Sequence, residues 1–71
     1  MNMERLDARG LSCPEPVIMI KNAMETQEET YEIIVDNRTS VENITRYGEH
    51  SGYTVSVARD GSDFIMTLTR S

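Results

Sequence analysis

The sequence predicts an α+β fold: a two-layer sandwich in the order β-α-β-α-β-β, with two helices on one face of a mixed four-stranded sheet. Two segments carry apolar residues at spacings of three and four, which is typical of amphipathic helices. The other segments are short and alternating or β-branched, and an Asp-Gly turn separates the last two. This order implies an early parallel pair joined by a helix and a late antiparallel hairpin, but it does not give the strand order.

The first strand is expected over residues 4–8, where Leu6 and Ala8 lie on one side and charged residues on the other. Gly10 then interrupts the chain. The first helix is expected from Pro14 to about Gln27, with its end between residues 26 and 29. Its buried face is predicted to carry Val17, Met19, Ile20, Ala23 and Met24.

The second helix is expected shortly after a strand at residues 31–36, which contains a β-branched run. Thr39 is its predicted N-cap, because Glu42 three residues later completes a capping box. Gly52 is expected to end this helix in the left-handed conformation. The inner face is predicted to carry Val41, Ile44, Thr45 and Gly48.

The C-terminal part of the chain is predicted to form a hairpin. Residues 53–58 and 64–69 alternate between apolar and polar side chains, and Asp60-Gly61 between them is a turn signal. The hairpin therefore supplies the third and fourth strands.

Length and charge exclude several classes of protein. The 71 residues fit one domain, residues 1–71, and the formal net charge of −5 disfavours direct nucleic-acid binding, which needs clustered basic residues. No run approaches the roughly 20 apolar residues of a membrane span, and the N-terminus lacks a signal-peptide pattern. A cytoplasmic protein without a membrane partner is the expectation, as a monomer or weak dimer.

The segment Cys13-Pro14-Glu15-Pro16 is the candidate site. Both prolines fit only in the first turn of a helix, where the missing N–H groups have no intrahelical partner in any case. Cys13 is then expected at the N-cap or just before it, with the remaining N–H groups of the turn pointing toward its sulfur. Gly10, Pro14, Glu15 and Pro16 are the residues expected to shape the site.

Cys13 is the candidate reactive residue. It is the only cysteine, so it has no partner for an internal disulfide or a Cys-X-X-Cys pair. A helix N-terminus lowers the pKa of a thiol, whereas the Glu15 carboxylate raises it, and the sequence leaves the net shift open. A lone cysteine is also often a small buried apolar residue. The proline context favours the alternative, a nucleophile that takes up and gives up sulfane sulfur.

The run L-D-A-R-G-L-S-C-P-E-P-V over residues 6–17 resembles the L-D-x-x-G-L-x-C-P-x-P signature of the TusA/SirA-like sulfur-carrier family. The later stretches V-D-N at 35–37 and S-V-E-N-I-T-R-Y at 40–47 are similar to the YedF-type branch, which is linked with selenium metabolism. The resemblance implies that Cys13 accepts sulfur from a cysteine desulfurase or rhodanese and relays it to an acceptor protein. It implies no cofactor and no metal.

Alternative functions remain at this point. The same fold can serve as a non-catalytic interaction module or as a selenium-handling domain. Asp7 and Arg9, beside the candidate site, are expected to be a solvated pair rather than catalytic groups. His50 is expected in the last turn of the second helix with a local structural role.

Overall fold

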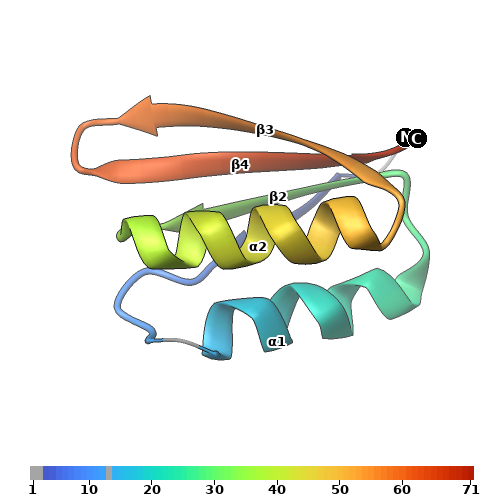
Figure 1. Ribbon diagram of the computed structural model, residues 1–71, viewed down its shortest axis with the longest axis horizontal. Coiled ribbons are helices and arrows are strands. Elements are labelled where there is room, and N and C mark those ends of the chain that lie inside the picture. The colour runs from blue at the N-terminus through green and yellow to red at the C-terminus, as the bar shows by residue number, and fades with distance from the viewer. Residues whose placement is uncertain (1–2, 13) are drawn as a thin grey trace.

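The computed structural model describes residues 3–12 and 14–71, and it confirms the predicted order of elements. Two helices pack on one face of a four-stranded sheet (Figure 1). A short 3-10 turn, η1, extends the first helix. The elements are β1 (Met3–Asp7), α1 (Glu15–Ala23), η1 (Met24–Thr26), β2 (Thr30–Val35), α2 (Arg38–His50), β3 (Tyr53–Asp60) and β4 (Asp63–Arg70).

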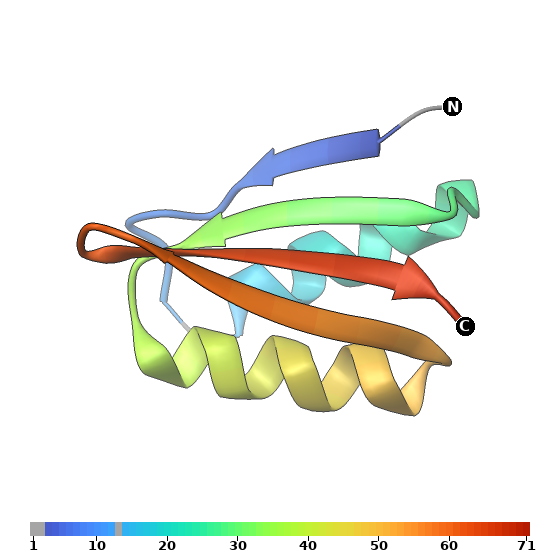
Figure 2. The same cartoon turned by 90° about the horizontal axis from the view of Figure 1, so that it is seen from above.

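The sheet has the strand order β1-β2-β4-β3, which Figure 2 shows from above. β1 and β2 are parallel, whereas β4 pairs antiparallel with both β2 and β3. Ile33 of β2 lies opposite Leu6 of β1 and Met66 of β4, so the inner face of the sheet is continuous across three strands. The early parallel pair and the late hairpin are therefore both confirmed.

The core lies between the sheet and the two helices. Along β2, every second side chain is buried, as expected for a strand with one covered face. Ile20 from α1 and Ile44 from α2 cover this face, and Met19 and Met24 pack against it, so the methionines serve as packing residues. The buried apolar residues are Ala8, Ile20, Tyr31, Ile33, Val35, Ile44, Tyr53, Met66 and Leu68.

The first helix ends differently from the prediction. The α-helix stops at Ala23, and the helical path continues to Thr26 only as a 3-10 turn. Gln27 then takes φ of 60°, in the left-handed region usually occupied by Gly or Asn. No glycine marks the end of this helix in the sequence. The change from α-helix to 3-10 turn therefore could not be predicted from the residues.

The predicted N-cap of the second helix was wrong. α2 begins at Arg38, and its N-cap is Asn37, whose side-chain oxygen accepts a hydrogen bond from the amide of Ser40 at 2.8 Å. Thr39 is already inside the first turn. Asn is a better N-cap than Thr, and Asn37 lies two residues closer to the end of β2, so the helix begins before Thr39.

Two glycines adopt a positive φ at the turns where the sequence predicted a chain reversal. Gly52 follows α2 with φ of 91°, which confirms the predicted left-handed residue at the end of the helix. The hairpin loop consists of Gly61 and Ser62, because Asp60 and Asp63 are already paired, so the loop lies one residue later than predicted. Gly61 has φ of 64°, as tight two-residue hairpins demand.

One end of the molecule collects the loops that matter for the site. β1 and β2 both finish there, α1 and α2 both begin there, and the tip of the β3–β4 hairpin lies at the same end (Figure 1). We call it the site end and define it by residues 8–12, 36–37 and 61–62. Among the described residues, no helix is long and apolar enough to cross a membrane.

Candidate functional site

Both prolines lie at the start of α1 as predicted, but the helix begins one residue later than expected, so Pro14 precedes the first turn. Pro14 is the N-cap, with φ of −101° and ψ of 17°, and Glu15 and Pro16 are the first two helical residues. Pro16 is buried, whereas Pro14 and Glu15 are exposed. The first helical hydrogen bond runs from the amide of Ile18 to the carbonyl of Pro14 at 3.0 Å. The prolines therefore fix the entry of the chain into the helix.

Cys13 itself lies outside the described residues, so its predicted role stays a prediction. Its neighbours narrow that prediction in two ways. Pro14 takes the N-cap, which was one of the two positions expected for Cys13. The amide of Glu15 donates to the carbonyl of Ser12 at 2.9 Å, and Pro14 has no N–H. The start of α1 therefore has fewer unbonded N–H groups than the sequence predicted there.

The loop before the helix, residues 8–12, is anchored to the end of β2. The amide of the buried Ala8 donates to the carbonyl of Ile34 at 2.8 Å, which continues the parallel pairing. The amide of Gly10 donates to a carboxylate oxygen of Asp36 at 2.8 Å. Gly10 has φ of 79°, so glycine is the residue suited to this bend.

Asp36 is a site-shaping residue that sequence reasoning missed. The Gly10 amide and then the side-chain amide of Asn37 stabilise its charged form and lower the pKa of the Asp36 carboxyl. A signal was available in the sequence, because a carboxylate directly after the second strand of a parallel pair lies near the loop that follows the first.

Asp7 and Arg9 form the pair that the sequence suggested, and it extends further than expected. Arg9 contacts both carboxylate oxygens of Asp7, at 3.0 and 2.8 Å, and reaches Asp63 of β4 at 3.3 Å. The Arg9 side chain lowers the pKa of Asp7 to about 2, and Asp7 in turn raises the pKa of Arg9. Their side chains are 57% and 49% exposed, so the pair is solvated as predicted, yet it ties this loop to the hairpin.

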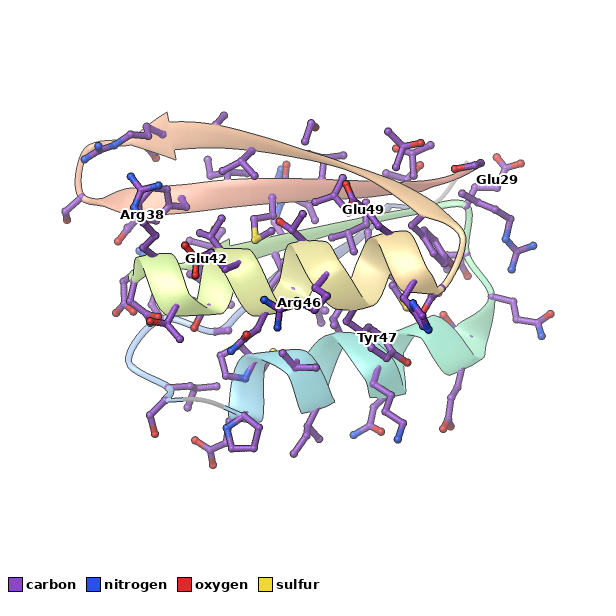
Figure 3. The ribbon with its side chains drawn as sticks, viewed as in Figure 1. Glu29, Arg38, Glu42, Arg46, Tyr47 and Glu49 are labelled. Atoms are coloured by element: carbon purple, nitrogen blue, oxygen red, sulfur yellow. The ribbon has the colours of Figure 1, made fainter. Side chains whose placement is uncertain are left out.

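An apolar groove lies between the two helices next to the start of α1. Pro14 and Val17 form one wall, and α2 forms the other, where Figure 3 shows Arg46 and Tyr47 on the side toward α1. Its volume is about 490 Å³. His50 lies at the groove in the last turn of α2, the position predicted for it. The α2 wall is made by Asn43, Arg46, Tyr47 and His50.

A metal site does not emerge from the described part of the chain. Within residues 3–12 and 14–71, no three His, Cys, Asp or Glu side chains lie close enough together to hold a metal ion. At the site end, Asp36 accepts hydrogen bonds from Gly10 and Asn37, and Arg9 contacts both Asp7 and Asp63.

The fold and the prolyl helix start together define a small SirA-like domain. The crystal structure of a SirA-like protein from Desulfitobacterium hafniense matches it with a TM-score of 0.86 over 96% of each chain, at 29% sequence identity. Residues 4–70 match the family described as Sulfurtransferase TusA. A protein of Methanocaldococcus jannaschii, named as a candidate sulfur carrier protein, is 40% identical over 60 residues, which are 82% of this chain and 80% of the relative.

The chain belongs to the TusA family. The resemblance seen in the sequence is thereby confirmed for the family and for the SirA-like fold. Membership supports a sulfur-carrier role, and such a role involves donor and acceptor proteins. The finer likeness to the YedF-type branch stays a prediction.

Proposed function

We propose that this protein takes up sulfane sulfur as a persulfide on Cys13 and passes it to a partner protein. The observation that carries the proposal is the position of the only cysteine in the sequence, between an anchored loop and a prolyl helix start. Membership in the TusA family supports sulfur as the cargo. No second cysteine is present to resolve the persulfide as a disulfide, which suits a relay.

The transfer is a pair of thiol exchanges that balance without an added oxidant or reductant. The Cys13 thiolate attacks the outer sulfur of a donor persulfide, a new S–S bond forms on Cys13, and the donor cysteine leaves as its thiolate. In the second step, a nucleophile of the acceptor attacks the outer sulfur and Cys13 leaves as a thiolate. One sulfur atom moves in each step, and protons exchange with solvent.

The described residues before and after Cys13 in the sequence support this chemistry in two ways. The partial positive charge at the start of α1 favours an anion nearby, which is the form that attacks in the first step and leaves in the second. The loop of residues 8–12, which precedes Cys13 in the sequence, is anchored by the hydrogen bond from the Gly10 amide to Asp36. A partner that reaches this helix start also meets the groove beside Pro14.

Intact-mass measurement tests the proposal. The purified protein is incubated with a cysteine desulfurase and cysteine, beside Cys13→Ala and a matched Ser12→Ala control that retains the thiol. A mass gain of one sulfur atom is expected on the wild type and on Ser12→Ala, absent on Cys13→Ala and removed by a reducing agent. Absence of the gain with several donors, while the variants remain folded, would refute the persulfide relay.

The same spectra separate the alternatives that the sequence left open. A selenium-handling domain would gain the mass of selenium when a selenium donor is supplied, in preference to sulfur. A non-catalytic interaction module would gain neither and would keep its biological activity in Cys13→Ala. We also propose that the protein works in the cytoplasm, since a free reactive thiol suits a reducing compartment.

A further inference from the structure

Phe64 is approached by two guanidinium groups at the site end. The guanidinium carbon of Arg38 lies 5.8 Å from the centre of the Phe64 ring, and that of Arg59 lies 5.3 Å from it. Arg38 comes from the first residue of α2, and Arg59 is the direct neighbour of Phe64 across the β3–β4 pair. Three elements thus bring two positive charges to one aromatic ring.

Asp36 and Asp60 lie close to the two arginines in the sequence, and Arg59 donates a hydrogen bond to the carbonyl of Gly61 at 3.4 Å. Neither Arg38 nor Arg59 takes part in an ion pair, within 4.0 Å, with any other described residue. The chain nevertheless carries twelve acidic residues. Arg38 also stands at a helix N-terminus, where a cation is unfavourable because the helix dipole is positive there. Two guanidinium groups outside the ion pairs of the described residues thus lie at one aromatic ring, one of them at a positive helix end, and both can attract an added anion.

The segments that carry the two arginines and Phe64 are linked to the loop of residues 8–12 by hydrogen bonds. Arg38 follows Asp36 by two residues, and Asp36 holds the amide of Gly10. Phe64 follows Asp63, which Arg9 of the same loop contacts. The loop that leads to Cys13 is therefore tied to both segments that carry the cluster of Arg38, Arg59 and Phe64.

We propose that this arginine cluster binds an acidic segment of a sulfur-transfer partner protein while that partner engages Cys13. The inference rests on the proposed function for the kind of partner. A short run of Asp or Glu fits the cluster, because two guanidiniums can take one or two carboxylates. A nucleic-acid backbone fits less well, because the remaining surface carries the net negative charge of the chain and repels a long polyanion.

Binding of an acidic peptide tests this inference independently of sulfur transfer. The isotope-labelled protein is titrated at low salt with a hexaglutamate peptide, and in parallel with a single-stranded oligonucleotide of equal charge. We expect saturable NMR shifts at the Arg38 and Arg59 side chains and at the Phe64 ring with the peptide. The affinity should fall roughly fivefold in Arg38→Gln/Arg59→Gln, since exposed ion pairs are individually weak, and should fall as salt is added.

The control removes the same charge elsewhere. Lys21→Gln/Arg70→Gln loses two exposed cations outside the cluster and should bind the peptide with nearly the wild-type affinity. Equal losses in both double variants, or no shifts at the cluster, would overturn the proposal. Tighter binding of the oligonucleotide than of the peptide would overturn the proposal that the cluster binds a protein segment. Arg38→Gln alone, at an exposed helix start, replaces the double variant if that one does not fold.

Discussion

The amide of Gly10 donates a hydrogen bond to the carboxylate of Asp36 at 2.8 Å, across 26 positions of the sequence. This bond joins the loop after β1 to the residue that follows β2. Asn37 supports the same carboxylate through its side-chain amide at 3.1 Å and also caps α2. The start of the second helix and the loop before the first are thus parts of one hydrogen-bonded unit.

Asp36→Asn should loosen the loop before Cys13 with little change in the rest of the fold. A neutral amide oxygen accepts a weaker hydrogen bond from Gly10 than a carboxylate does. We expect the Gly10 amide to exchange with solvent severalfold faster, whereas amides of the β2–β4 pairing keep their rates. In the mass experiment, sulfur uptake should become slower without being abolished. Unchanged exchange at Gly10 would contradict the anchoring role of Asp36.

Most of the fold was predictable because its signals are local. The helical and alternating patterns reflect burial on one face, and Gly52 and Gly61 mark turns whose φ values only glycine adopts easily. Strand order was not predictable, since it depends on the pairing of β2 with β4, which are about 30 residues apart and carry no register signal of their own.

The candidate site was predictable only in part, because some of its features are local and others depend on contacts between distant segments. Pro14 and Pro16 restrict the backbone by themselves, so their place at the helix start followed from residue type. Asp36 acts on Gly10 through a contact that exists only after β1 and β2 have paired. The approach of Arg38 and Arg59 to Phe64 likewise requires three elements to be in place.

Asn37→Ala should destabilise the protein by about 1 kcal/mol, the usual cost of losing an N-cap side chain. The structural reason is the bond from the Ser40 amide to the Asn37 side chain at 2.8 Å. Thr39→Ala is the matched variant, and its effect should stay within about 0.5 kcal/mol, as for ordinary surface changes. Urea unfolding measures both. A larger loss for Thr39→Ala would restore Thr39 as the helix cap.

Gly48→Ala should destabilise the packing of α2 on the hairpin. A Cβ atom at Gly48 would lie 2.8 Å from a methyl group of Leu68 and 2.9 Å from one of Val55. Overpacking costs about 1–3 kcal/mol, and the better helix propensity of alanine offsets about 1 kcal/mol of it. We therefore expect a net loss of about 1 kcal/mol in urea unfolding, while Glu49→Ala on the exposed side stays near zero. Stabilisation by Gly48→Ala would show that Leu68 and Val55 can move away from the added methyl group at little cost in free energy.

Asp7 should contribute to the loss of stability in acid. Its folded pKa is lowered to about 2 from 3.8, mainly by the Arg9 side chain, so folding favours the ionised form. A group with a depressed pKa stabilises the folded state above its unfolded pKa, and this contribution is lost as pH falls through the folded value. The relevant window therefore runs from about pH 4 down to about pH 2, and Asp36 acts in the same direction.

In Asp7→Asn, the free energy of unfolding should fall less steeply than in the wild type as the pH is lowered. Urea unfolding from neutral to strongly acidic pH should show the variant less stable than the wild type at neutral pH and closer to it in acid. Asp60→Asn, at the end of β3 and outside the ion pairs of the described residues, is the matched control and should keep the wild-type slope. High salt should reduce the difference, because the Asp7–Arg9 pair is exposed. Parallel curves for the wild type and Asp7→Asn would contradict a pKa of Asp7 that is lower in the folded than in the unfolded chain.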